Sequence, residues 1–294
     1  MTDTTPVQES AADAVQTVIA HADSETEPLN LGLLTDEEVY LYADDVAAAG
    51  PYGTWFAALP EEQRQAAALA AVRVLTSRGE IDSVLSDDGA ADVRLPTQLT
   101  AAVVLRRLEA QLSLRVIGAL GETWYVLRHV RGELYLREGI SPQGYHALSL
   151  VRLDDAEREL FLERFQLPEG AESVEPLDLD ITLTETQLEA ASIEITQQLR
   201  FLDDTAYIGN LATTAADGTI ETSMVHVLSD ARIVVGDLAA GRVHYRGITP
   251  ATLRERWDAW RQAQSGRVSA DADSGLNAHP ELLTTPVVAG DDAS

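Results

Sequence analysis

Hydrophobic and polar positions change their period along the chain, from helical spacing to alternation and back again. Apolar residues three or four positions apart predict a helix over Thr97–Leu112. Alternating stretches then predict four strands, and a second helical stretch follows them. The strands are expected at Leu114–Leu120, Thr123–Val130, Glu133–Glu138 and Tyr145–Leu153, and the second helix at Asp155–Phe165. This part of the chain is therefore predicted to form a helix–sheet–helix unit.

The same order of elements recurs in the second half of the chain. A helix is expected at Glu185–Leu202, with a capping box formed by Thr184 and Gln187 at its start and a long apolar seam behind it. Strands are expected at Ala206–Thr214, Thr219–Leu228, Arg232–Asp237 and Arg242–Ile248, and a helix from Pro250. The repetition predicts an α+β fold with a twisted, largely antiparallel sheet, built from two pseudo-twofold halves and flanked by helices.

The segments outside the two copies have a different composition. Residues 1–30 contain few large apolar side chains, so we expect a disordered acidic arm in which Ala11–Ala22 forms at most a weak helix. Leu177–Leu183 alternates leucine or isoleucine with aspartate or threonine, which favours an edge strand. The predicted organisation is an arm (1–30), a first half (31–165), a linker with the edge strand (166–184), a second half (185–264) and a disordered acidic tail (265–294).

The net charge limits which classes of molecule can be binding partners. The 294 residues carry a formal charge of −27, and every basic residue other than histidine is arginine. Such a field repels nucleic acid and anionic lipid, and it argues against a transcriptional regulator. The acidic bias fits either a GC-rich genome, as in actinobacteria, or adaptation to salt. No apolar run approaches the roughly 18 residues of a membrane-spanning helix, so we expect a cytoplasmic protein without membrane insertion.

No motif predicts catalysis. The chain has no cysteine, which removes thiolate chemistry and disulfides. No histidine pair has the spacing of a metal site, and the glycines do not form a phosphate-binding loop. Asp178 and Asp180 share a strand face, but charges on an edge strand protect it from aggregation. We therefore expect a non-enzymatic protein without metal or cofactor; the alternatives are an enzyme with a dispersed site and an acidic regulatory protein-binding module.

Aromatic and arginine side chains on the predicted sheets are the candidates for binding a protein partner. Such side chains are common anchors of interfaces when a sheet face is open. Core packing is the competing interpretation for about half of them. The candidate partner-binding residues are Trp124, Tyr125, Arg128, Tyr135, Arg137, Met224 and His226.

Several segments resemble the EspG family of cytosolic chaperones of type VII (ESX) secretion. They are the Ala-rich helix that ends at Ala70–Gly79, the Leu-rich helix Leu99–Leu112, the strand Gly241–Tyr245 and the helix start Thr249–Arg254. The resemblance spans Leu31–Ala263 and fits the pseudo-twofold α+β architecture. It implies a chaperone that binds the helical tip of a PE–PPE-like pair and uses no catalytic residue.

Overall fold

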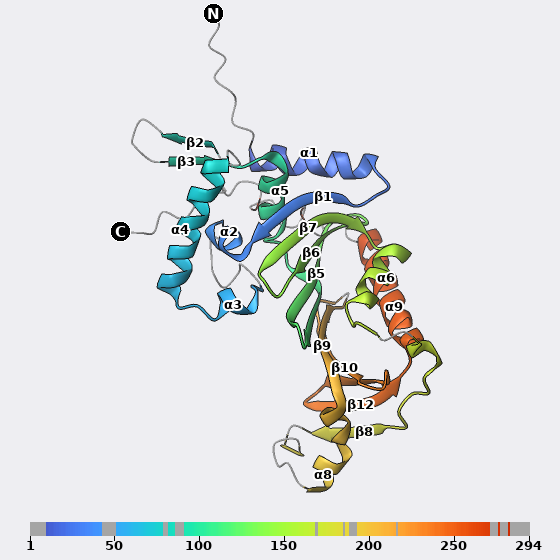
Figure 1. Ribbon diagram of the computed structural model, residues 1–294. Helices are drawn as coiled ribbons and strands as arrows, with labels where there is room; N and C mark the ends of the chain where they lie inside the picture. The colour runs from blue at the N-terminus through green and yellow to red at the C-terminus, as the bar shows by residue number, and fades with distance from the viewer. Residues whose placement is uncertain are drawn as a thin grey trace, which may run out of the picture. The chain divides into compact units, whose positions relative to one another are not determined.

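The predicted α+β fold class is confirmed by a computed structural model, which describes residues 10–42, 51–78, 82–85, 91–167, 170–184, 186–187, 193–215, 217–270, 276 and 282. Within these residues the strands form one open ten-stranded sheet and a separate hairpin (Figure 1). The strands are β1 (Leu29–Thr35), β2 (Asp82–Leu85), β3 (Ala91–Arg94), β4 (Ala110–Gly118), β5 (Gly121–Arg131), β6 (Leu134–Ile140), β7 (Tyr145–Arg152), β8 (Asp180–Thr184), β9 (Thr205–Thr214), β10 (Ile220–Leu228), β11 (Ile233–Ala239) and β12 (Arg242–Ile248).

The repeated order of elements is present in the strand topology. The large sheet has the order β1-β7-β6-β5-β4-β9-β10-β11-β12-β8, so two four-strand meanders adjoin through β4 and β9. Each meander gains an antiparallel outer strand from the preceding part of the chain, β1 on β7 and β8 on β12. The helical elements are α1 (Ala11–Ser24), α2 (Asp36–Leu41), α3 (Thr54–Ala57), α4 (Glu61–Arg78), α5 (Thr97–Leu105), α6 (Asp155–Glu163), η1 (Ala171–Ser173), α8 (Ile193–Gln198), η2 (Arg200–Asp204) and α9 (Pro250–Ala270).

The chain folds into two compact units, and their boundaries differ from those of the two repeats. Unit 1 comprises residues 1–109, 128–151 and 273–294, and unit 2 comprises residues 110–127 and 152–272. Strand β4 and the first part of β5 therefore belong to unit 2, although both come from the first repeat.

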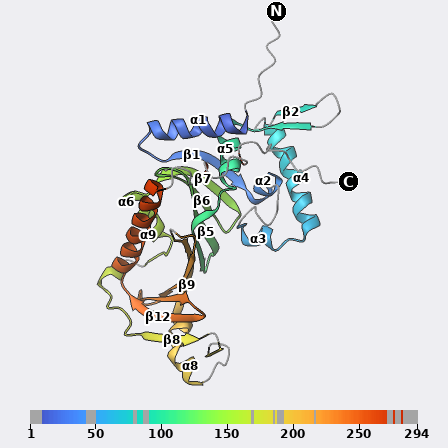
Figure 2. The same cartoon turned by 180° about the vertical axis from the view of Figure 1, so that it is seen from behind.

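Helix α1 and strand β1 are part of the core of unit 1. Ser10 caps α1, because its Oγ accepts the Asp13 N–H at 3.1 Å. Val15 and Ile19 of α1 are fully buried in a cluster that includes side chains of α5, and both ribbon views show α1 beside α5 (Figures 1 and 2). The prediction of a disordered arm is therefore wrong from residue 10 onward. The weak helix predicted at Ala11–Ala22 is helix α1, which packs in the core of unit 1.

The ends of two other predicted helices also differ from the structure. The helix that begins at Thr97 ends at Leu105, and the chain turns into β4 at Ala110. Helix α9 continues to Ala270, and Leu276 is buried in the core of unit 1, so the expected disordered tail does not begin at residue 265. In both cases buried contacts, rather than local composition, decide where order ends.

The two faces of the sheet in unit 2 are covered by different elements. Helix α9 and the Phe161 side chain of α6 lie on the face that contains Val225, and Phe201 and Tyr245 pack around His226 on the other face. Adjacent residues of a strand point to opposite faces, which explains this division of β10. Figures 1 and 2 both show α6 beside α9.

The predicted helix Glu185–Leu202 ends earlier than expected, at Gln198. The capping box is confirmed, because the Thr184 N–H donates to Gln187 Oε1 at 2.9 Å and the Gln187 N–H donates to Thr184 Oγ1 at 3.3 Å. Helix α8 ends at Gln198 and the chain continues as the 3₁₀ turn η2, which leaves Leu202 38% exposed. Residues 188–192 of the seam lie outside the described residues, and Ile195 is partly buried.

Candidate functional site

The predicted partner-binding residues do not form one exposed surface. Arg128, Tyr135 and Arg137 belong to unit 1, and Trp124, Tyr125, Met224 and His226 belong to unit 2. Four of the seven are buried: Tyr125 is 1% exposed, Tyr135 2%, Arg128 4% and His226 4%. The expectation of an open sheet face is wrong for these four, since their side chains pack inside their own unit. Trp124, Arg137 and Met224 are partly buried, and their role in binding stays a prediction.

Trp124 and Tyr125 illustrate how alternation on β5 separates neighbours. The indole of Trp124 lies under Arg115, whose guanidinium carbon is 5.6 Å from the ring centroid, and its Nε1–H donates to Glu122. The Tyr125 hydroxyl instead donates to Glu157 Oε1 at 2.5 Å, and its ring packs against Phe161. Trp124 is therefore part of a half-open polar cluster, whereas Tyr125 is a core residue.

His226 is enclosed by aromatic rings. The centroids of Phe201 and Tyr245 lie 5.6 and 6.2 Å from that of the imidazole, and neither ring nitrogen has a hydrogen-bond partner among the described residues. Burial lowers the pKa of His226 to about 4, so the ring is neutral at physiological pH. The ring is therefore packed as an aromatic side chain of unit 2, and no carboxylate of the described residues is hydrogen-bonded to it.

Unit 1 contains a buried ionic cluster centred on Glu138. Its carboxylate accepts hydrogen bonds from Arg106 at 2.6 Å and from Arg128 at 2.7 Å, and it lies 2.7 Å from His146 Nδ1. Burial alone would raise the pKa of Glu138, but the two guanidinium groups and His146 outweigh it and hold this pKa well below its usual value. Burial favours neutral His146, yet its hydrogen bonds to Asp36 and Glu138 raise its pKa.

The ionic cluster connects separate segments of unit 1 to one another. His146 Nε2 lies 2.8 Å from Asp36 Oδ1, which also accepts the Gly53 N–H at 2.8 Å. A Cβ at Gly144 would approach Asp36 Oδ2 to 1.9 Å, so only glycine fits there. The charges bind one another inside a tightly packed region, and they fix the start of α2 and the segment before α3 to the sheet.

An apolar cavity of about 330 Å³ lies in unit 2, between α9 and strands β4, β9 and β10. Its walls include the large side chains of Phe161, Trp257 and Trp260. The remaining positions include several small side chains, which leave the space unfilled. The lining consists of Leu112, Phe161, Leu211, Thr213, Ala215, Glu221, Ser223, Val225, Leu253, Arg256, Trp257, Ala259, Trp260, Ala263 and Gln264. A cavity of this size and composition is typical of a binding site.

Helix α9 is held over the sheet at both ends of the cavity. Arg256 donates to both carboxylate oxygens of Asp237, at 2.8 and 2.7 Å, and Gln264 Nε2 donates to the Thr214 carbonyl at 3.0 Å. Burial would raise the pKa of Asp237, but hydrogen bonds from Arg256 and Ser223 lower it to about 2. These contacts make the cavity wall a fixed part of unit 2.

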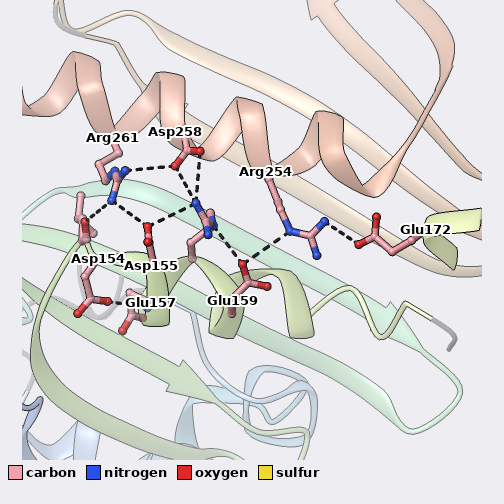
Figure 3. Close-up of polar contacts among 10 residues, drawn as sticks. Asp154, Asp155, Glu157, Glu159, Glu172, Arg254, Asp258 and Arg261 are labelled. Carbon is pink, nitrogen blue, oxygen red and sulfur yellow. Dashed lines mark hydrogen bonds and ion pairs between the residues drawn. The ribbon is translucent and has the colours of Figure 1, made fainter. Parts of the chain in front are cut away.

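A row of ion pairs connects the outer side of α9 to α6 (Figure 3). Arg158 lies 3.4 Å from Asp258, and Arg261 lies 3.6 Å from Asp155. Arg254 joins the row through Glu159 of α6, at 3.6 Å. Each pair is partly exposed and contributes little by itself, but the alternation of acids and bases fixes the register of the two helices.

Most side chains that line the cavity are apolar. Among the described residues, no group of three or more His, Cys, Asp or Glu side chains has the arrangement of a metal site. Within the cavity, Ser223 donates its hydroxyl hydrogen to Asp237 at 2.7 Å. Leu253, Trp257 and Trp260 form the buried stripe of α9. The helical pattern of the sequence does not indicate the hollow, because the opposite wall comes from strands distant in sequence.

A search of the described helices for a membrane-spanning segment finds none of sufficient length and apolar character.

Comparison with known proteins gives a distant structural similarity. No protein-family model matches the chain, and no curated protein matches it. A solved structure, that of the Mycobacterium tuberculosis type VII secretion system chaperone EspG5 in complex with the PE25–PPE41 dimer, is 10% identical in sequence and has a TM-score of 0.45. The match covers 81% of this chain and 96% of that chain. The chain is thus distantly similar in structure to a member of the family that its sequence segments resemble.

Proposed function

We propose that the protein is a cytosolic, non-enzymatic chaperone or adaptor whose protein partner docks at the cavity beside α9. The observation that carries this proposal is the cavity itself, which is mainly apolar and whose wall is held in place by the hydrogen bonds of Arg256 and Gln264. Inserting an apolar side chain of the Leu or Phe type contributes about 1.5–3 kcal/mol by burial. Interface hot spots commonly consist of one such anchor in a fitted pocket.

The partner class is a helical secretion substrate of the PE–PPE kind. The EspG-like segments of the sequence support this choice, and the strongly negative charge argues against nucleic acid and anionic membranes as partners. In such a role the protein would cover an apolar surface of the substrate until export. The cavity would then receive one exposed apolar side chain of that surface.

The test is site-specific photo-crosslinking in the native host. A benzoylphenylalanine placed at Ala263, on the cavity wall, is expected to capture a helical secreted protein. The matched control position is Ile117, which is 37% exposed and points to the opposite face of the unit 2 sheet from Val116. Capture at Ile117 but not at Ala263 would show that the docking site is wrong. Capture of no helical secreted protein at either position would contradict the proposed function.

A further inference from the structure

We infer that the segment of the partner that enters the cavity carries an apolar side chain directly flanked by a lysine or arginine. This inference rests on the proposed function and specifies the chemistry of the partner. It follows from three properties of the cavity: its small-residue walls, the carboxylate of Glu221 at its rim and the buried indole N–H of Trp257, the last two having no partner among the described residues.

The space exists because small side chains face one another across it. Thr213 and Ala215 stand on the sheet side, and Ala259 and Ala263 stand on α9. Trp257 and Trp260 occupy neighbouring positions on the same helix and are 5.3 Å apart between ring centroids, so they form a rigid aromatic wall. An apolar group that enters this space exchanges water for aromatic and aliphatic contacts.

The carboxylate of Glu221 gives the cavity a negative rim. Glu221 lies directly opposite Thr213 in the pairing of β10 with β9, and both residues line the cavity. Its side chain is exposed and makes no hydrogen bond or ion pair with the described residues. The positive charge in the lining, Arg256, is already matched by Asp237. The cavity therefore has one unmatched negative charge, in a chain of net charge −27, and it favours a cationic group over an anionic one.

The indole of Trp257 adds a requirement for a hydrogen-bond acceptor. This side chain lines the cavity and is 2% exposed, and its Nε1–H has no partner among the described residues. Leaving a buried donor without an acceptor is unfavourable, and an incoming carbonyl oxygen would accept this hydrogen bond. A hydrocarbon has no acceptor, and a fatty acid brings a carboxylate that Glu221 repels. A polypeptide with a basic residue next to an apolar one supplies an apolar side chain for the space, a positive charge for Glu221 and a carbonyl oxygen for Trp257.

The experiment uses two acetylated, amidated tetrapeptides that differ at one position, Ala-Leu-Arg-Ala and Ala-Leu-Glu-Ala. Binding to the full chain is followed by the ¹⁵N–¹H signals of the tryptophan indoles. The basic peptide is expected to shift the Trp257 signal and to bind at least tenfold more tightly than the acidic one. Glu221→Gln should remove most of this preference, whereas Glu255→Gln, an exposed α9 position outside the lining, should preserve it.

Three results would overturn the inference: equal affinity for the two peptides, an unchanged preference in Glu221→Gln, or no binding of either peptide. These failures are separate from failure of the proposed function. If a helical secreted protein crosslinks at Ala263 but the peptides show no preference for the basic residue, the chaperone role is supported and the charge requirement is wrong. If no partner crosslinks, the proposed function is wrong.

Discussion

His226 allows a sharp test of how unit 2 is packed. Both ring nitrogens are buried between Phe201 and Tyr245 and have no partner in the part of the chain that the structure describes. Burial lowers the pKa of the ring to about 4. In the unfolded chain the ring regains an ordinary pKa near 6.5. Between these two values the unfolded state binds a proton that the folded state excludes. Folded stability is therefore unaffected by this group above pH 6.5 and falls as the pH is lowered toward 4.

The size of the effect follows from the difference between the two pKa values. A shift of one unit corresponds to about 1.4 kcal/mol, so lowering the pH from 7.5 to 4.5 is expected to destabilise the fold by about 2–3 kcal/mol through His226. Replacing the ring by leucine removes this contribution. At pH 7.5 the His226→Leu variant should match or slightly exceed the stability of the wild-type protein, because two unpaired buried nitrogens are also removed.

The assay is urea unfolding of the wild-type protein and of His226→Leu at pH 7.5 and 4.5, monitored by tryptophan fluorescence. Trp124, Trp257 and Trp260 all belong to unit 2 and report on it. The stability advantage of the variant is expected to grow by about 2–3 kcal/mol at the lower pH. A matched His21→Gln variant, at an exposed position of α1, should show no such growth. Equal pH dependence in His226→Leu and wild type, or an NMR titration of His226 near pH 6.5 in the folded protein, would refute the reasoning.

The remaining predictions concern both units. Glu138→Gln leaves two buried guanidinium groups without full countercharge and should destabilise unit 1 by about 3–5 kcal/mol in thermal unfolding; a loss below about 1 kcal/mol would contradict the buried network. Deleting residues 2–24 should lower the melting temperature markedly because α1 is buried, whereas deleting residues 2–9 leaves α1 intact as its control. Ile195→Ala, at a partly buried position, should cost about 1–2 kcal/mol, and a larger loss would show that α8 is more deeply packed. Asp237→Asn should cost about 1–2 kcal/mol above pH 4, with the difference disappearing as the pH falls toward 2; a pH-independent difference would rule out the lowered pKa.

Local patterns in the sequence determined the elements and their order. The capping boxes of Thr35 with Glu38 and of Thr184 with Gln187 are both formed, because each depends only on residues three positions apart. The alternation of apolar and polar residues likewise predicted the strands of the two meanders. Such signals depend on the chain geometry of a few residues, so they can be recognised without knowing what packs against them.

Which side chains are buried was decided by tertiary structure. Alternation shows that Tyr125 and Trp124 lie on opposite faces of β5, but it does not show that α6 covers one of them. Strand β1 was missed because it contains Gly32 at a bulge and pairs with β7 more than 100 residues later. The cavity was missed for the same reason: its walls come from segments that are distant along the chain. Their separation is set by long-range packing, and no local pattern of residues encodes it.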